Sequence, residues 1–217
     1  MTLLADQTWT EVDPDALLVL PLGATEQHGP HLPLSTDTDI ATELCRRLAA
    51  AYPAAVLAPA LPYGASGEHA GFAGTLSLGQ EALELVLVEL VRSAMLTYRR
   101  VLLVSAHGGN AEPLGRAVRR LREEGHDVRA WGPSWPGDAH AGRTETSVQL
   151  ALGAPVRPFL APGVTTSIAE LLPALRAGGV LAVSPTGVLG DPRGATAEDG
   201  ELLLTQAADQ LLAWVSR

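Results

Sequence analysis

The chain has 217 residues, of which 24 are acidic and 15 basic, and its formal net charge is −9. With 47% hydrophobic and 18% charged residues it can bury a sizeable core and is not a disordered chain. The acidic balance argues against nucleic-acid and anionic-membrane partners, and no apolar run approaches the ~18–20 residues that span a bilayer. Residues 1–6 lack the basic region of a secretory signal, so we expect a cytoplasmic protein.

The first half of the chain predicts alternating strands and helices. Residues 17–22 form a short apolar run ending at Gly23, which is typical of a buried strand. From Thr36 or Asp37 onward, apolar residues repeat at helical spacing behind a residue type that caps helices. The same criteria then predict a strand over 54–58, a Gly/Pro-rich loop over 59–74, a helix over 80–98, a strand over 101–105 and an amphipathic helix over 111–124.

The second half continues the alternation. The expected elements are a strand over 127–131, a loop over 132–142, a helix through Leu150, a helix over 167–175, a strand over 179–184 and a closing helix over 195–215. Strands that are apolar throughout indicate a parallel sheet covered on both faces. No repeat or linker divides the chain, so we expect a single three-layer α/β domain over residues 1–217 with a mostly parallel central sheet.

Two residue types that are rare or absent exclude several chemistries. The one cysteine, Cys45, leaves no intrachain disulfide, no thiolate zinc ribbon and no CxxC redox pair. All 15 basic residues are arginines, which removes Schiff-base lysines and the P-loop lysine. A metal site in this chain would therefore use carboxylates and imidazoles, which suit Zn²⁺, Mn²⁺ or Fe²⁺.

Polar stretches follow two of the predicted strands, where open α/β sheets bind their ligands. The strand over 17–22 runs into a stretch with Glu26 and His28, whose side chains point to the same side of an extended backbone. The strand over 101–105 runs into His107-Gly108-Gly109-Asn110, and a third polar stretch over 138–147 opens a helix. These candidates outnumber the ligands of one ion and suit a carboxylate-bridged pair of divalent ions, which could hydrolyse an amide.

Four motifs resemble the creatininase family of metal-dependent amidohydrolases. Residues 23–34, GATEQHGPHLPL, with TDT at 36–38, are similar to the opening signature of that family. The later motifs match in order and spacing: HGGN at 107–110, HAG at 140–142 with ETS at 145–147, and TGVLGDP at 186–192. The resemblance runs from about residue 17 to the end of the chain. It implies a di-metal α/β hydrolase of C–N bonds, commonly a homohexamer.

The same resemblance implies roles for individual residues. Glu26 and His107 would lie on one ion and His28 on the other, with Asp37 bridging the two. A simpler role for Asp37 is to cap the following helix, which would stabilise it by about 1 kcal/mol. A bridging ligand can also cap, so the two roles are compatible.

One departure from the family pattern affects the second ion. Creatinine-cleaving members carry a glutamate two residues after the histidine that corresponds to His107, where this chain has Gly109. The missing carboxylate is then expected from Glu145, as in family branches that share the His-Gly-Gly-Asn form. Glu112 is the rival ligand, and a solvated first-turn carboxylate is the alternative role for Glu145.

Within the family, residues 63–69 and 72–75 resemble the branch that acts in mycofactocin maturation. That branch releases a C-terminal Val-Tyr dipeptide from a modified precursor peptide. Glu68 and His69 would then belong to a substrate-binding loop, with a solvated turn as the alternative. Trp131 and Trp135 could stack on the aromatic leaving portion of the peptide.

His140 is the expected catalytic residue, because imidazole titrates near neutral pH and could protonate the leaving nitrogen. Its alternative role is to orient a metal ligand. Rival functions are hydrolysis of a cyclic amide such as creatinine, deformylation of a formylaminopyrimidine, or a metal-binding scaffold without turnover. A Gly-x-Ser-x-Gly elbow is absent from the sequence, which argues against a serine nucleophile.

Overall fold

The computed structural model describes residues 1–135, 137–158 and 161–217, and a five-stranded sheet lies at its centre. The paired strands all run parallel, in the order β1-β3-β2-β4-β5. Their bounds are β1 Thr2–Leu3, β2 Leu17–Leu22, β3 Ala55–Leu57, β4 Arg100–Ser105 and β5 Val128–Trp131. The expected parallel sheet is confirmed, and β1 is an edge strand that the sequence patterns did not predict.

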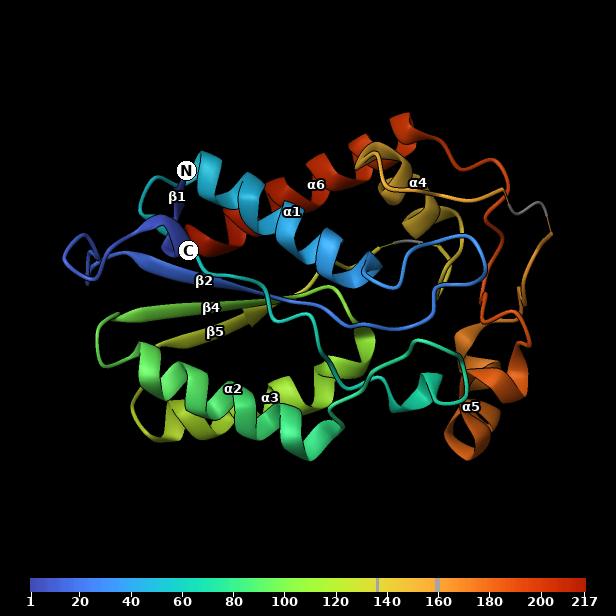
Figure 1. Ribbon diagram of the computed structural model, residues 1–217, viewed down its shortest axis with the longest axis horizontal. Coiled ribbons are helices and arrows are strands. Elements are labelled where there is room, and N and C mark those ends of the chain that lie inside the picture. Colours follow the sequence, from blue (N-terminus) through green and yellow to red (C-terminus); the bar gives the residue numbers. More distant parts are fainter. Residues whose placement is uncertain (136, 159–160) are drawn as a thin grey trace.

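Helices cover both faces of the sheet. Among the described residues they are α1 Thr36–Ala51, α2 Gln80–Ala94, α3 Ala111–Glu123, α4 Arg143–Ala151, α5 Ile168–Val183 and α6 Ala197–Val215, with 3₁₀ turns η1 Leu4–Asp6, η2 Gly67–His69 and η3 Gly108–Asn110. Figure 1 shows α1 and α6 on one side of the sheet and α2 and α3 on the other. The three-layer α/β architecture is therefore confirmed.

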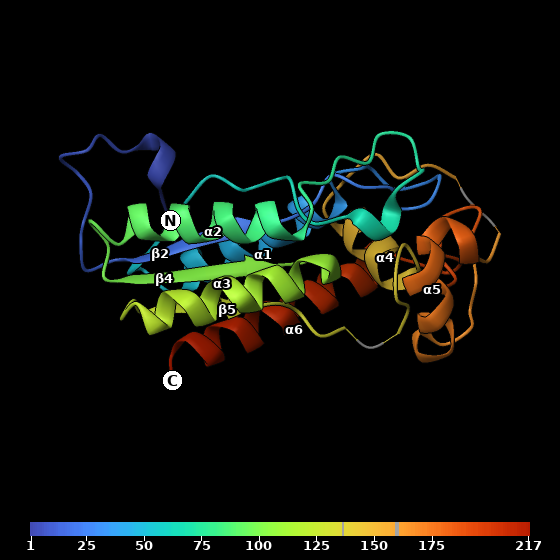
Figure 2. The same cartoon turned by 90° about the horizontal axis from the view of Figure 1, so that it is seen from below.

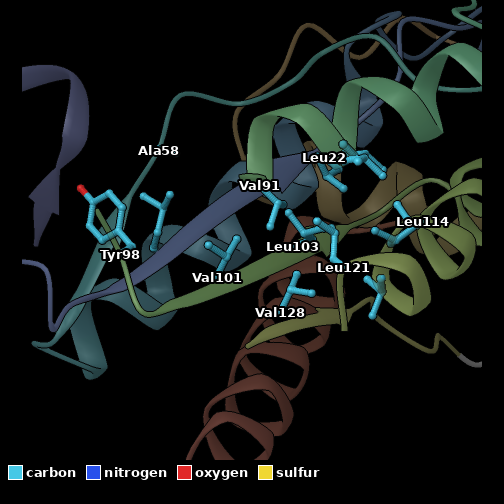
Figure 3. Close-up of a cluster of buried hydrophobic side chains, with 14 of the residues drawn as sticks. Leu22, Ala58, Val91, Tyr98, Val101, Leu103, Leu114, Leu121 and Val128 are labelled. Carbon is cyan, nitrogen blue, oxygen red and sulfur yellow. The ribbon is translucent and has the colours of Figure 1, made fainter. Parts of the chain in front are cut away.

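Two hydrophobic cores lie between these layers, because successive residues of a strand face opposite sides of the sheet. Leu18 and Leu22 of β2 pack toward α2 and α3, in the cluster drawn in Figure 3. Leu17 and Val19 pack toward α1 and α6. Each fully buried leucine contributes roughly 1.5–3 kcal/mol relative to an exposed one, so the central strands are firmly held.

Helix α5 lies apart from these layers, beyond the carboxyl ends of the strands, in both views (Figures 1 and 2). The predicted strand over 179–184 is wrong, because these residues continue α5 past a kink at Gly179, where φ is 69°. This segment lies away from the sheet, so its backbone makes helical hydrogen bonds instead of pairing with a strand. The Ser184 N–H, for example, donates to the Val180 carbonyl at 2.8 Å. The described residues include no helix that is both long and apolar enough to cross a membrane.

Candidate metal centre

The segment after β2 carries two of the expected ligands into a buried position. The Glu26 N–H donates to the Leu34 carbonyl at 3.1 Å, which folds the segment back on itself. The His28 imidazole donates from Nδ1 to the Glu26 carbonyl at 3.2 Å, so Nε2 is the nitrogen that faces the other side chains. Glu26 and His28 have no exposed surface. A histidine whose second nitrogen donates to a backbone carbonyl is oriented as metal-ligating histidines usually are.

Helix α1 delivers Asp37 to the same place. Gly23, at the end of β2, lies against Thr38 so closely that a Cβ there would overlap it, which seats the first turn of α1 on the strand end. Asp37 Oδ1 lies 3.2 Å from His28 Nε2, and Oδ2 lies 3.3 Å from His107 Nδ1. The N-cap of α1 is Ser35 rather than Asp37, so the Asp37 side chain faces two histidines instead of capping the helix.

His107 follows β4 and is oriented in the same manner as His28. Its Nε2 donates to the Ala65 carbonyl at 3.1 Å and lies 3.2 Å from Glu26 Oε2, which leaves Nδ1 toward Asp37. Asn110 fixes this loop, because its side chain donates to the Gly23 carbonyl at 3.0 Å and accepts from Ala65 N–H at 2.9 Å. The HGGN motif thus ties the ends of β2 and β4 to the segment before α2.

Glu145 reaches the cluster from the first turn of α4. Its Oε2 accepts the Ala141 N–H at 2.6 Å and lies 3.9 Å from His28 Nε2. Ala141 adopts a φ of 51°, a strained value for a residue with a side chain, and this turn aims the carboxylate inward. The rival Glu112 is 70% exposed and pairs with Arg116 at 2.8 Å on the surface of α3. The structure therefore brings Glu145, and not Glu112, to the other ligands.

The five expected ligands form two groups that share one carboxylate. Glu26, Asp37 and His107 make one group, and His28, Asp37 and Glu145 make the other. Within each group the ligand atoms lie within 4.8 Å of one another. This is the arrangement that a pair of ions with a bridging carboxylate needs.

The charges within this cluster oppose one another. Burial and the nearby Asp37 carboxylate raise the pKa of Glu26 to about 8. Burial lowers the pKa of His28, but the Asp37 and Glu145 carboxylates outweigh it and raise that pKa to about 10. Burial likewise raises the pKa of Asp37, yet His28 and His107 hold it far below its usual range. Protons on the imidazoles thus balance buried carboxylates, a role that a divalent cation can take over.

Unsatisfied oxygens test whether these residues suit a metal ion. Both carboxylate oxygens of Glu26 and Oδ2 of Asp37 are buried and accept no hydrogen bond from the described residues, although imidazole nitrogens lie 3.2–3.3 Å away. Buried carboxylates are costly unless hydrogen bonds, charges or metals satisfy them. Oxygen and imidazole donors in these groups suit zinc, manganese or iron, so the residues fit the implied ions.

Gln27 organises two further histidines beside the cluster. Its side-chain nitrogen donates to His69 Nδ1 at 2.8 Å, which directs His69 Nε2 toward Glu26 Oε1 at 3.2 Å. Its backbone carbonyl accepts from His140 Nε2 at 2.8 Å. Burial and the charge on His28 hold the pKa of His140 well below its usual value. Gln27 was missed in the sequence, although its place between Glu26 and His28 could have drawn attention to it.

A cavity of about 830 Å³ opens beside the cluster. Its described lining includes Glu26, His107 and His140 from the cluster, Glu68 and His69 from η2, and residues of α5 that the sequence did not predict, among them Leu172 and Arg176. His69 is buried and Glu68 partly exposed, so this segment forms a wall of the cavity rather than a solvated turn.

The two tryptophans of the loop over 131–137 lie elsewhere. Trp131 and Trp135 are partly buried and pack against the core between the sheet and α1 and α6. Neither belongs to the described lining of the large cavity, although Trp131 lines a smaller one of about 350 Å³ that shares His107 and Gly108 with it. Residue 136 of this loop lies outside the described residues. The stacking role of these tryptophans stays a prediction.

Known proteins share both the sequence and the fold. The family described as creatininase, creatinine amidohydrolase, matches residues 5–215. The mycofactocin precursor peptide peptidase of Mycobacterium ulcerans (strain Agy99) is 50% identical over 212 residues, which cover 92% of this chain and 84% of that protein. The creatinine amidohydrolase of Pseudomonas putida is 34% identical over 137 residues, which cover 56% of this chain and 52% of that protein.

Solved structures agree with this relationship. A structure named Creatininase Mn has a TM-score of 0.82 at 27% identity and covers 99% of this chain and 97% of its own. A variant creatininase described as Zn-Zn type has a TM-score of 0.81 at 26% identity and covers 98% and 96%. With the family match across nearly the whole chain, these likenesses establish that the protein belongs to the creatininase family and is a hydrolase of that family.

Proposed function

We propose that this hydrolase is a peptidase that cleaves an amide bond in the modified mycofactocin precursor peptide and releases its C-terminal Val-Tyr portion. The observation that carries the proposal is the pair of three-residue groups sharing Asp37 beside a large cavity that Glu26 and His107 line. The substrate assignment is supported by relatives of that name that are about half identical over most of the chain.

The ligand roles follow from orientation. Glu26 and His107 would hold one divalent ion, His28 and Glu145 the other, and Asp37 both. When bound, such ions polarise an amide carbonyl and lower the pKa of water to near neutrality. The backbone carbonyls that accept from His28 Nδ1 and His107 Nε2 leave the opposite nitrogens free of protons in the neutral rings.

His140 is proposed to transfer a proton to the departing nitrogen. Burial favours its neutral form, and the Gln27 carbonyl holds the proton of that form on Nε2. The neutral ring would first take up a proton, from the water that adds to the carbonyl, and would then donate a proton to the departing nitrogen. The rival role is to orient a ligand, since its ring lies 4.3 Å from that of His28 between centroids.

The first experiment is the metal content per chain, by plasma mass spectrometry, in the native protein and in Glu26→Ala. We expect about two divalent ions in the native protein and loss of ions and turnover in the variant. Glu81→Ala, which removes an exposed carboxylate at the start of α2, should keep both. A native protein without metal, and without activity on adding Zn²⁺, Mn²⁺ or Fe²⁺, would favour the scaffold function.

Turnover assays then separate the substrates. The modified precursor peptide, creatinine and a formylaminopyrimidine are incubated with the same metal-loaded protein. Cleavage of the peptide alone supports the proposal, and cleavage of creatinine or the formamide instead replaces it. His140→Ala should lose turnover while keeping its metal. Loss of metal in that variant would support the orienting role or a ligand role for His140 itself, which forms a third candidate group with Glu26 and His28.

The oligomeric state also belongs to this proposal. Family resemblance implies a homo-oligomer, with a hexamer as the expected state, and exposed leucines on α2 such as Leu85 and Leu90 offer apolar surface for it. Light scattering measures the assembly as a multiple of the 22.6 kDa chain. A monomer at working concentration would contradict this part of the proposal and leave the site unaffected.

A further inference from the structure

Glu68 stands beside the metal-ligand groups but belongs to neither. Its Oε1 lies 3.6 Å from His107 Nε2, and its side chain is 37% exposed on the cavity wall. Glu26 and Glu68 are the two carboxylates in the described lining of the cavity, and Glu26 is wholly buried among the ligands. Glu68 is therefore the carboxylate that a molecule in the cavity can reach.

The carboxylate of Glu68 has acceptor capacity to spare. Within the described part of the chain it accepts no hydrogen bond, and its contact with His107 is long. The His107 Nε2 proton already goes to the Ala65 carbonyl at 3.1 Å. An ionised carboxylate offers about four lone-pair sites, so Glu68 can accept from a donor brought by a ligand.

Two glycines hold Glu68 in this place. A Cβ on Gly109 would overlap Glu68 Oε1 and the Ala65 carbonyl, so the segment over 65–68 lies directly on the HGGN loop. A Cβ on Gly179, at the kink of α5, would lie 2.6 Å from the Glu68 carbonyl oxygen. The backbone of Glu68 is thus pressed between the metal-binding loop and α5, and its position next to His107 is set by packing.

We propose that Glu68 is a substrate-binding residue that accepts a hydrogen bond from the nitrogen of the scissile amide and then binds the amino group that cleavage exposes. This proposal rests on the amide hydrolysis proposed above. Water adds to the carbonyl carbon, the C–N bond breaks, and the products are a carboxylate and an amine that takes up a proton. A carboxylate close to that nitrogen makes a charge-assisted hydrogen bond to the resulting ammonium.

The chemical class recognised by Glu68 is accordingly a primary amine, not an acid. An acid beside it would be repelled by the Glu68 carboxylate, whereas an ammonium group would be attracted. Arg176, which lines the same cavity and makes no ion pair within the described residues, is the lining arginine available to an acidic group. Glu68 and Arg176 thus offer opposite charges to the two products.

The test compares two probes on the metal-loaded protein by calorimetry. The dipeptide Val-Tyr has a free amino group, and 3-methylbutanoyl-tyrosine is the same molecule without that group. We expect the native protein to bind the free dipeptide about tenfold more tightly and Glu68→Gln to lose most of this preference. The amide is the same size as the carboxylate, so packing against Gly109 and Gly179 is kept.

A matched variant and the metal content separate binding from structure. Glu123→Gln makes the same chemical change at an exposed position at the end of α3 and should keep the preference. Equal weakening of both probes by Glu68→Gln, or a native protein without preference for the free amine, would overturn the proposal. Binding of the probes needs no turnover, so failure to cleave the precursor peptide would count against the proposed function alone.

Discussion

The two groups that share Asp37 are built from different parts of the fold. Glu26 and His107 come from the ends of neighbouring central strands, β2 and β4, whose side chains pack in both cores. His28 also follows β2, but its partner Glu145 comes from α4, which packs mainly on α6. The geometry of the first group therefore depends on the central sheet, whereas that of the second depends on how α4 packs on α6. We expect them to differ in how easily they lose their ion.

The largest effect should come from the residue that the two groups share. Asp37→Asn removes one negative charge from both, so we expect both ions and turnover to be lost, with turnover falling more than about a thousandfold. Metal analysis and peptide cleavage measure this. The control is Asp39→Asn. Asp39 lies on the same first turn but accepts from Ser35 Oγ at 2.8 Å, so this variant should keep both ions. A variant at Asp37 that retains two ions would remove the bridging role.

Removing the α4 ligand should affect one group only. Glu145→Gln keeps the acceptor for the Ala141 N–H but loses the charge near His28, so we expect about one ion per chain in place of about two. The control is Glu112→Gln, which changes the rival carboxylate on the surface of α3. If Glu112→Gln lost the ion and Glu145→Gln kept it, the assignment of the second group would be reversed.

Metal binding to both groups should strengthen as the pH rises. In the metal-free protein the pKa of His28 is raised to about 10, that of His107 to about 9 and that of Glu26 to about 8. These groups hold protons at pH 7 that an ion must displace, and each displaced proton gives about a tenfold gain in affinity per pH unit. Competition with a chelator at about pH 6 and about pH 8 measures this. A pH-independent affinity would contradict the protonated state of the cluster.

The smallest change tests the docking of α4. Gly200 of α6 lies against the Ser147 carbonyl, and a Cβ there would overlap that carbonyl and lie 2.8 Å from Val148 N. We expect Gly200→Ala to cost about 1–3 kcal/mol of unfolding free energy and to weaken the Glu145 group before the Glu26 group. Thermal melts and metal titration measure the two effects.

Gly115→Ala, in helix α3, is the matched control for Gly200→Ala. The nearest atom to a Cβ at Gly115 in α3 is Arg119 Nη1 at 3.7 Å, which is ordinary contact. Because glycine weakens a helix interior by about 0.5–1 kcal/mol relative to alanine, this variant should be slightly more stable. A similar gain at Gly200 would mean that α4 tolerates displacement.

The sequence predicted the parts of the fold that rest on local patterns. Residues 17–22 and 101–105 are apolar stretches followed by polar motifs; they form β2 and most of β4, and candidate ligands follow both strands. The segment over 179–184 failed because its apolar pattern does not reveal that it lies beyond the sheet, where a kinked helix forms instead. β1 was not predicted because its two residues are too few to show a strand pattern.

The residues of the candidate site could be predicted where they lie within recognisable sequence motifs. The structure brings together five side chains that the motifs named, and their roles as metal ligands stay a prediction: Glu26, His28, Asp37, His107 and Glu145. The contributions of Gln27 and of α5 were missed, because they depend on contacts between segments far apart in the chain. The exposed side of Glu68 and the core position of Trp131 are likewise tertiary facts that no spacing rule contains.

The buried carboxylate oxygens of Glu26 and Asp37 also bear on how such a protein can change over generations. A lineage that lost only its use for metal would still carry acidic groups in its interior, which protons on neighbouring imidazoles such as His28 and His107 would have to balance. Replacement of those imidazoles would then leave the acids without a counter-charge. Metal binding and fold stability are therefore linked in this protein. The buried acids are tolerated only while metal ions or protonated imidazoles neutralise them.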